Sequence, residues 1–145
     1  FIEVEPTLAN CPNFRRHLIT LAEQGRWPRQ DVNLAAQLLE NEQVIGSVRL
    51  GLDGQDGADL GYVFGSSWWG VGYGYEAASA VLAVAFETLE LHRVWANCDA
   101  RNAASVRLLE KLGMRQEGAM LKDRKVRDGW RDTHLYALLA DEWRG

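Results

Sequence analysis

The chain has 145 residues, of which 47% are hydrophobic and 25% are charged, and its formal net charge is −4. This size and composition are typical of one globular domain with a real core and argue against global disorder. The acidic balance disfavours a duplex-DNA binder, and no apolar run approaches the ~20 residues that a bilayer span needs. We therefore expect a single domain over residues 1–145, with neither nucleic acid nor membrane as a partner.

The cysteine content and the first residues favour a cytoplasmic protein. The two cysteines, Cys11 and Cys98, are expected to be free thiols, because a disulfide framework in a domain of this size uses more of them. The stretch from Phe1 to Glu5 is acidic and lacks the basic start of a signal peptide. No Cys and His residues have the spacing of zinc ligands, so we expect no metal.

Taken in chain order, the apolar periodicity first predicts a helix over 8–24 and then a hairpin of two strands over 34–40 and 44–50. A third strand over 60–64 follows a glycine-rich loop. A helix over 75–90, a strand over 93–99 and a helix over 103–112 come next, with Asn102 as an N-cap and Gly113 just past a C-terminus. A final hairpin, 120–127 and 130–139, flanks a turn at Asp128-Gly129. This order predicts an α/β (α+β) domain with a largely antiparallel sheet.

A glycine-rich segment joins the third strand to the helix after it. Its residues are Trp69, Gly70, Val71, Gly72, Tyr73, Gly74 and Tyr75. Glycines let the backbone approach a ligand, and the first turn of a helix presents N–H groups at the positive end of the helix dipole. The segment therefore predicts an anion site suited to a pyrophosphate, with a mere tight turn as the alternative. The P-loop pattern is absent, and G-x-G-x-G fits a dinucleotide fingerprint poorly.

This segment resembles motif A of the GNAT acetyltransferase superfamily, Gln/Arg-x-x-Gly-x-Gly/Ala, with Gly72 and Gly74 at the two small positions. Further segments resemble the subfamily of ribosomal-protein N-terminal (alanine/serine) acetyltransferases. They are Glu76-Ala77, Asn102-Ala103-Ala104-Ser105, Leu109-Glu110-Lys111-Leu112-Gly113-Met114 and Glu117-Gly118. The resemblance covers roughly residues 44–143. Trp69 departs from the pattern, since the family carries Gln or Arg there.

The resemblance implies the GNAT fold, a mixed and mostly antiparallel sheet that splays between strands 4 and 5 and has flanking helices. Those two strands would be 60–64 and 94–98, and acetyl-CoA would lie in the gap between them. The family usually begins with a further strand and helix, and the chain does not start with Met, so we expect the first strand to be missing from these residues. Homodimers are common in the family, and a homodimer is one expected assembly.

The same resemblance implies a set of cofactor-binding residues along the loop, the two strands and the next helix. They are Val63, Phe64, Trp69, Gly70, Val71, Gly72, Tyr73, Gly74, Tyr75, Asn97, Asn102 and Ser105. Ser105 would lie near the sulfur and is the candidate acid, with support of the helix cap as its alternative role. Asp59 is the candidate base, with a loop-end carboxylate as the alternative. Asp123 and Tyr136 are read first as a surface charge and a packed side chain, and otherwise as a base and a wall of the acceptor cleft.

Together these features predict an acetyl-CoA-dependent N-acetyltransferase that acts on a primary amine, either a protein N-terminus or a small amine. One alternative is a non-catalytic acyl-CoA-binding module, which would keep the glycine loop and lack a working base. Another is a nucleotide-binding domain that uses the loop for ATP or a dinucleotide, although the missing P-loop lysine and the antiparallel strand order argue against it.

Overall fold

The computed structural model describes residues 31–37, 44–65 and 72–144. In this part of the chain, six strands form one sheet in the order β1-β2-β3-β4-β6-β5. The strands are β1 (Asp31–Gln37), β2 (Val44–Leu52), β3 (Gly57–Phe64), β4 (Arg93–Asp99), β5 (Arg115–Val126) and β6 (Gly129–Leu139). All neighbouring strands run antiparallel except β3 and β4, which are parallel. The predicted mixed, mostly antiparallel sheet is confirmed.

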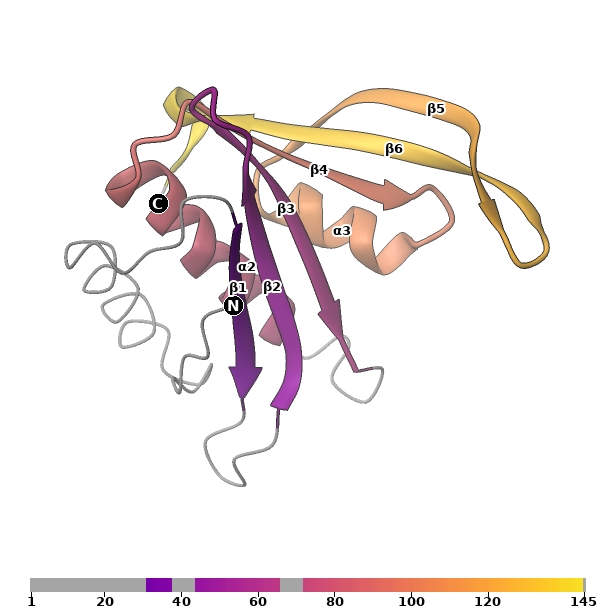
Figure 1. The fold of residues 1–145 in the computed structure, drawn as a ribbon, viewed down its shortest axis with the longest axis horizontal. Helices are drawn as coiled ribbons and strands as arrows, with labels where there is room; N and C mark the ends of the chain where they lie inside the picture. Colours follow the sequence, from indigo (N-terminus) through magenta and orange to yellow (C-terminus); the bar gives the residue numbers. More distant parts are fainter. Residues whose placement is uncertain (1–30, 38–43, 66–71, 145) are drawn as a thin grey trace.

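Two helices pack against the sheet (Figure 1). The first, α2 (Tyr73–Ala83), runs on into a π-helical turn, η3 (Val84–Thr88), and the second is α3 (Ala103–Lys111). A short 3-10 turn, η4 (Ala140–Glu142), follows β6. Neither α2 nor α3 has the length or the apolar stretch that a membrane span requires, and the rest of the described chain holds no such helix.

The core lies between the two helices and one face of the sheet. Alternate strand residues point to that face because side chains of a strand alternate with a period of two. They pack against small and aliphatic residues of the helices, and the members of this core include Val48, Leu50, Leu60, Val94, Ala96, Leu138, Ala78, Val81, Leu82 and Leu109. Fully burying one such leucine contributes about 2 kcal/mol. The core therefore fixes α2 and α3 on the same face of the sheet.

The feature that matters most for function is a split in the sheet between β3 and β4. The two strands pair only at their first residues, with Ala58 opposite Val94 and Asp59 opposite Trp95 as the last paired positions. Beyond these positions β3 stays paired with β2 and β4 with β6, and the two halves of the sheet diverge (Figure 1). The predicted splay between strands 60–64 and 94–98 is thus confirmed.

In the described residues the predicted order of helices and strands is confirmed, but several of their predicted boundaries were wrong. Observed β1 begins and ends three residues earlier than the strand predicted over 34–40. The helix predicted over 75–90 starts at Tyr73 and becomes π-helical at Val84. The predicted strand over 120–127 begins at Arg115. The last hairpin closes at the pair Val126 and Gly129, so its turn lies one residue earlier than predicted. The helix predicted over 8–24 lies outside the described residues.

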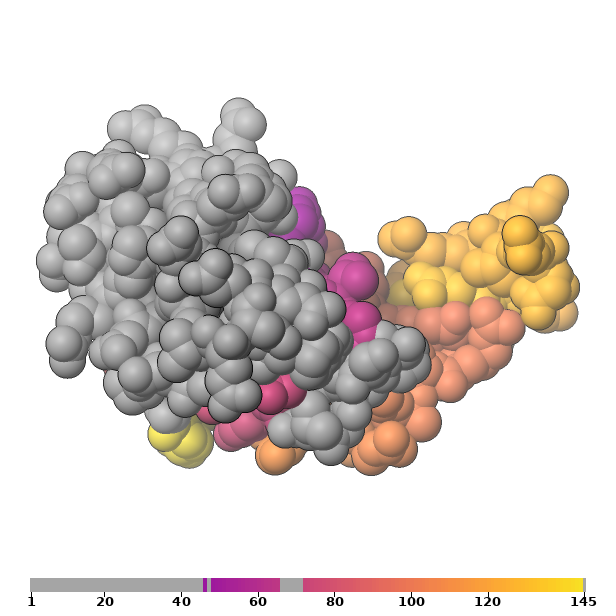
Figure 2. Space-filling model, turned by 90° about the horizontal axis from the view of Figure 1, so that it is seen from below, coloured from indigo at the N-terminus to yellow at the C-terminus, as the bar shows by residue number. Residues whose placement is uncertain are grey.

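The β5–β6 hairpin extends beyond the rest of the sheet. In Figure 2 its far end, in orange and yellow, stands out from the molecule as an arm. Leu121 and Trp130 on this arm are 77% and 59% exposed. These side chains are apart from the cavity described next, which is built from β3, α2 and α3.

Candidate active site

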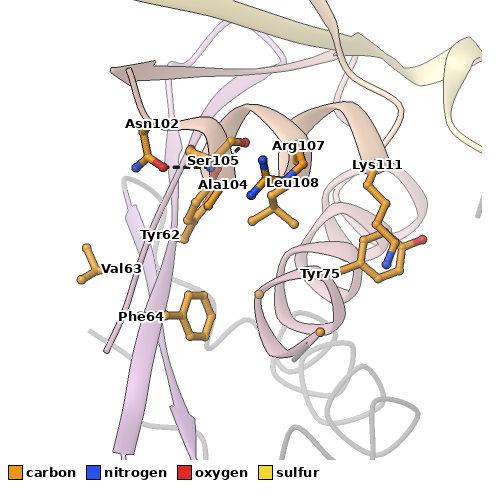
Figure 3. A pocket seen from close by; sticks show the side chains of 12 residues that line it. Tyr62, Val63, Phe64, Tyr75, Asn102, Ala104, Ser105, Arg107, Leu108 and Lys111 are labelled. Atoms are coloured by element: carbon orange, nitrogen blue, oxygen red, sulfur yellow. Dashed lines mark hydrogen bonds between the residues drawn. The ribbon is translucent and has the colours of Figure 1, made fainter. Parts of the chain in front are cut away.

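A cavity of about 540 Å³ lies beside the split, bounded by β3, the start of α2 and one face of α3 (Figure 3). Its lining residues are Tyr62, Val63, Phe64, Gly72, Gly74, Tyr75, Asn102, Ala104, Ser105, Arg107, Leu108 and Lys111. A concave site of this volume, mostly apolar with a few polar groups, is typical of small-molecule and cofactor sites. The cavity joins the split of the sheet to a helix N-terminus.

One wall of the cavity is the N-terminal end of α2. Gly72 is the N-cap residue and has a φ of 93°, in the left-handed region that favours glycine. Its carbonyl accepts the first helical hydrogen bond, from the Glu76 N–H at 3.1 Å, and no side chain caps this end. A side chain at Gly74 would contact Leu108 of the adjacent helix α3, since an added Cβ would lie 3.4 Å from Leu108 Cδ2. The helix dipole therefore faces a space kept open by two glycines, as an anion site requires.

The adjoining wall is a basic face of α3. Arg107 and Lys111 lie four residues apart, so they project from the same side of the helix. The Lys111 ammonium lies 4.4 Å from the centre of the Tyr75 ring, a cation–π contact that ties α3 to the first turn of α2. Phe64 and Leu108 supply apolar surface between the two walls (Figure 3). This arrangement suits a long ligand with an anionic end and a less polar arm.

Three polar groups meet where β3 and β4 separate. The Tyr62 hydroxyl on β3 lies 2.6 Å from Ser105 Oγ on α3 and donates more weakly to the Ser105 carbonyl at 3.4 Å. Burial raises the pKa of the Tyr62 phenol, and the hydrogen bond with Ser105 lowers it in part. Burial likewise raises the pKa of the Cys98 thiol on β4, which a hydrogen bond from Ser105 lowers in part. Ser105 is thus placed between a phenol and a thiol at the split.

The position of Ser105 is set by the cap of α3. Asn102 is the N-cap residue, and its side-chain oxygen accepts the Ser105 N–H at 3.0 Å. This is the usual bond between an N-cap side chain and the third residue of a helix. It leaves the Ser105 hydroxyl available for contacts within the cavity. The predicted N-cap role of Asn102 is confirmed.

The structure brings together most of the predicted cofactor-binding residues that it describes. Those that line the cavity are Val63, Phe64, Gly72, Gly74, Tyr75, Asn102 and Ser105. Tyr73 lies in the first turn of α2 and does not line the cavity, and Asn97 is an exposed residue of β4 that does not line it either. The predicted residues Trp69, Gly70 and Val71 lie outside the described residues.

The other candidate catalytic residues lie away from the cavity. Asp59 points to the face of β3 opposite Tyr62, and its Oδ2 accepts a hydrogen bond at 2.6 Å in an ion pair with Arg49 of β2. Asp123 accepts a hydrogen bond from the Thr133 hydroxyl at 2.6 Å. Tyr136 is buried in the core, which agrees with its reading as a packed side chain. The role of Asp59 therefore stays a prediction.

Sequence reasoning did not single out Tyr62, Arg107 or Lys111 as site residues. For the two basic residues a signal existed, because their four-residue spacing places both on one face of the helix that begins at Asn102. Tyr62 carried a weaker signal, its position two residues before Phe64 on the same face of a strand. Its contact with Ser105 joins residues 43 apart in the chain and follows only from the packing of α3 beside β3.

Within residues 31–37, 44–65 and 72–144, no group of three or more His, Cys, Asp or Glu side chains is arranged to hold a metal ion. Polar groups of the described residues that line the cavity are backbone N–H groups, the hydroxyls of Tyr62, Tyr75 and Ser105, the Asn102 amide and the cations of Arg107 and Lys111. The two cations suit anionic groups of a ligand, and the hydroxyl pair suits transfer of a proton.

A family model described as an acetyltransferase (GNAT) domain matches residues 5–115. The chain is 38% identical over 90 residues to YnaD, an uncharacterized N-acetyltransferase of Bacillus subtilis (strain 168), covering 62% of this chain and 53% of that protein. It is 40% identical over 85 residues to the ribosomal protein uS5-alanine N-acetyltransferase of Escherichia coli (strain K12), covering 58% of this chain and 43% of that one. The chain thus spans about half the length of these curated relatives.

The fold is also that of a solved relative. The structure of Mycobacterium smegmatis RimJ in complex with CoA-disulfide superposes with a TM-score of 0.70 at 27% identity, covering 90% of this chain and 61% of that one. Together with the match to the uS5-alanine N-acetyltransferase, this confirms the resemblance to ribosomal-protein N-terminal acetyltransferases that the motifs predict.

Proposed function

Because the chain belongs to the GNAT acetyltransferase domain family, we propose that it is an N-acetyltransferase that uses acetyl-CoA to acetylate a primary amine. The observation that carries the proposal is the cavity at the split between β3 and β4, with a helix N-terminus on one side and a basic helix face on the other. Acetyl-CoA has phosphates at one end and a thioester at the other. The cavity offers matching chemistry at its two ends.

The phosphate end would lie at the start of α2. Backbone N–H groups of the first turn, after Gly72, would donate to the pyrophosphate, and the helix dipole would favour its charge. Arg107 and Lys111 on the adjoining face of α3 would contribute two cations. The pantetheine amides would pair with the backbone of Val63 and Phe64, on the edge of β3 that faces the split, as an added strand does.

The thioester end would lie near Ser105. Transfer needs a neutral amine as nucleophile, stabilisation of the negative charge that builds on the carbonyl oxygen, and a proton for the departing sulfur. A thiol has a pKa near ~8.5, so a modest acid is sufficient. Ser105 is the proposed acid, and backbone N–H groups where the strands separate are the proposed donors to the oxygen.

Asp59 is the proposed base. It occupies the last paired position before β3 and β4 separate, on the face of the sheet opposite the cavity. With the thioester reaching the split from the side of the helices, the amine would approach from the side of Asp59. The Oδ2 atom of this carboxylate accepts a hydrogen bond from Arg49. We propose that the Oδ1 atom takes the proton from the amine, directly or through water.

The first acceptor to test is a protein N-terminus. One relative, at 40% identity, is named for acetylating the alanine of ribosomal protein uS5. We propose peptides with N-terminal alanine or serine as the leading substrate class, with small amines as the second. A cytoplasmic location fits this class of acceptor.

A second candidate function is a non-catalytic acyl-CoA-binding module. It is favoured by one specific observation, that no carboxylate is among the described residues lining the cavity. Such a module would bind acetyl-CoA through the same helix end and basic face and would transfer nothing. Binding alone therefore does not separate the two candidates, whereas turnover does.

The test is to incubate the purified chain with acetyl-CoA and a panel of peptides, polyamines and amino acids. Release of the CoA thiol is followed by a colorimetric reagent, and the gain of one acetyl group on the acceptor by mass spectrometry. We expect thiol release that depends on an amine and on Ser105. Tight acetyl-CoA binding with no acetylated product from any acceptor would favour the binding module, and no binding would refute both candidates.

A further inference from the structure

We propose that Tyr62 holds and polarises the Ser105 hydroxyl, so that a Tyr62–Ser105 pair, rather than Ser105 alone, delivers the proton to the departing sulfur. This inference rests on the proposed function. Tyr62 would act through Ser105 and is therefore a positioning residue in this scheme.

The two hydroxyl groups come from different elements and meet in the wall of the cavity (Figure 3). Tyr62 is on β3 and Ser105 is in the first turn of α3, and their oxygens are 2.6 Å apart. This separation is at the short end for hydrogen bonds between hydroxyls. The second contact of the phenol, with the Ser105 carbonyl, is longer at 3.4 Å. The Ser105 side chain is therefore the principal partner of Tyr62.

The direction of this bond follows from acidity. A phenol is a stronger acid than an aliphatic alcohol, so Tyr62 is the better donor and Ser105 Oγ the acceptor. A hydroxyl carries one proton and two lone pairs. When Ser105 accepts from Tyr62, its own proton is left to donate elsewhere, towards the Cys98 thiol or into the cavity. In the reverse direction Ser105 would donate its only hydroxyl proton to Tyr62 and would have none to donate into the cavity.

The surroundings keep the phenol in the form that donates. Burial raises the pKa of Tyr62, so it stays protonated at neutral pH. The other titratable groups lining the same cavity, among the described residues, are Tyr75 on α2 and Arg107 and Lys111 on α3. Cys98 on β4 acts on Tyr62 electrostatically and is paired in the sheet with His134 of β6. The thiol of Cys98 raises the pKa of Tyr62 further. A neutral phenol beside a neutral serine is thus the resting state.

The proton transfer balances without any other reactant. The amine nitrogen forms a bond to the acetyl carbon, and the carbon–sulfur bond breaks with its electron pair going to sulfur. Sulfur takes the proton of Ser105 Oγ as Ser105 Oγ takes the proton of Tyr62. Asp59, the proposed base, takes the proton that the acetylated nitrogen loses and returns it through solvent water, and the tyrosinate regains a proton in the same way. The products are the amide and the CoA thiol, and both hydroxyls are restored.

The test is a double-mutant cycle with Tyr62→Phe and Ser105→Ala, measured as kcat and as KM for acetyl-CoA. Both variants keep the backbone bond from Ser105 to Asn102, and phenylalanine keeps the packing of the ring. We expect each single change to lower kcat about 10- to 100-fold, up to the lower end of the range for general acid catalysis. The double variant should be no slower than Ser105→Ala, and KM should change less than threefold.

A second readout separates proton donation from packing. Replacing Tyr62 by 3-fluorotyrosine keeps the hydroxyl and makes the phenol more acidic. We expect kcat near that of the wild type at neutral pH and a fall of kcat at alkaline pH that begins at a lower pH than in the wild type. A purely structural role would leave the pH profile unchanged.

Three results would overturn the inference. One is a Tyr62→Phe variant that turns over at the wild-type rate, and another is a double variant slowed by the product of the two single effects. The third is an unchanged alkaline profile with fluorotyrosine. Wild-type protein that transfers acetyl to no amine would refute the proposed function itself and this inference with it, and the wild-type assay is therefore run first.

Discussion

The rim of the cavity depends on a backbone conformation that glycine adopts without strain. Gly72 has a φ of 93°, and an added Cβ there would meet no atom within 4 Å. Substitution by alanine therefore adds backbone strain alone, which costs about 1–2 kcal/mol for a side chain in the left-handed region. Relief of this strain would rotate the first N–H groups of α2 away from the cavity. We expect Gly72→Ala to weaken acetyl-CoA binding at least tenfold, measured by calorimetry.

A matched control for this change exists in the same chain. Gly54, in the exposed loop between β2 and β3, has a φ of 78° and also has no atom within 4 Å of an added Cβ. Gly54→Ala should lower the free energy of unfolding by a similar amount and leave acetyl-CoA affinity unchanged. Equal loss of affinity in both variants would mean that stability, and not the geometry of the α2 end, accounts for the effect.

Asn102 offers a second prediction at the scale of one residue. Its side-chain oxygen accepts the Ser105 N–H, so removing it leaves a helix donor without its cap. Asn102→Ala should lower the free energy of unfolding by about 1 kcal/mol, and Asn102→Ser, which keeps a capping oxygen, by much less. Urea denaturation measures both. A cost below ~0.3 kcal/mol for the alanine variant would contradict the capping role.

Single residues show which parts of the site the sequence predicts and which it does not. Gly72, Asn102 and Gly113 act through the conformation of their own neighbourhood, and local sequence is enough to assign them. Tyr62 matters only because α3 packs beside β3, and no local pattern records that contact. Asp59 was predicted at the start of the strand that carries Tyr62, and it lies on that strand, β3. Its ion pair with Arg49, on the face of the sheet opposite the cavity, depends on the register of β2 against β3.

Among the elements, α3 gives the cavity its charge. The face that carries Arg107 and Lys111 lies beside the first turn of α2, so both cations would act on phosphates of the ligand. Arg107→Ala and Lys111→Ala should each weaken acetyl-CoA binding about 5- to 10-fold, which corresponds to about 1 kcal/mol. The loss should be greater at low than at high salt, because partly exposed charges are screened.

The control for this prediction changes the same residue types on another element. Arg124 and Lys125 lie on β5, are exposed and do not line the cavity. Their alanine variants remove the same net charge from the molecule. If Arg124→Ala and Lys125→Ala weakened binding as much as the α3 variants, the effect would be one of overall charge, and the assignment of the α3 face would be wrong.

The turn between β4 and α3 makes stability sensitive to acid. The side-chain hydrogen bond from Arg101, with further contributions from the Arg101 backbone and Arg131, holds the pKa of the Asp99 carboxyl well below its ordinary value. Such a group stabilises the fold above the ordinary pKa near ~3.9 and loses its contribution as the pH falls towards the lowered value. The free energy of unfolding should therefore drop as the pH falls from about 4 to 2.

Replacing this carboxylate tests the assignment. Asp99→Asn should lower stability at pH 7 and flatten its decline at acidic pH, with the rest of the decline due to Glu117 and Glu142, whose pKa values are also lowered. Asp141→Asn, at an exposed carboxylate, is the control variant. Denaturant titrations at several pH values measure both, and an unchanged acid profile in Asp99→Asn would contradict the account.

Element boundaries were harder to predict than element types, and β5 shows why. Its first residues, Arg115 to Glu117, have no apolar alternation, yet Arg115 pairs with Ala137 of β6 and Glu117 forms a salt bridge with Arg93 of β4. Pairing with β6 and the salt bridge to β4, and not a local apolar pattern, therefore determine that β5 begins at Arg115. By contrast β4 was predicted with its observed bounds, since it is a central strand with a regular alternation of buried and exposed residues.

For the molecule as a whole, the split sheet is the central feature. The chain carries a net charge of −4, whereas both charged residues that line the cavity in the described part of the chain, Arg107 and Lys111, are cationic. This local reversal of sign would draw an anionic ligand into the split. The splay between residues 60–64 and 94–98 was implied by resemblance to a family, and apolar periodicity by itself predicted only a mostly antiparallel sheet. The order of the strands and the parallel pairing of β3 with β4 follow from the structure alone.

The most direct test of the central claim is a calorimetric titration of the wild-type chain with acetyl-CoA, set against ATP and NAD. We predict one acetyl-CoA site per chain, much weaker binding of ATP and NAD, and a gain in stability of about 2.7 kcal/mol at a ligand concentration one hundred times Kd. Absence of acetyl-CoA binding in a folded sample, or equally tight binding of ATP, would contradict the assignment of the split between β3 and β4 as an acetyl-CoA site.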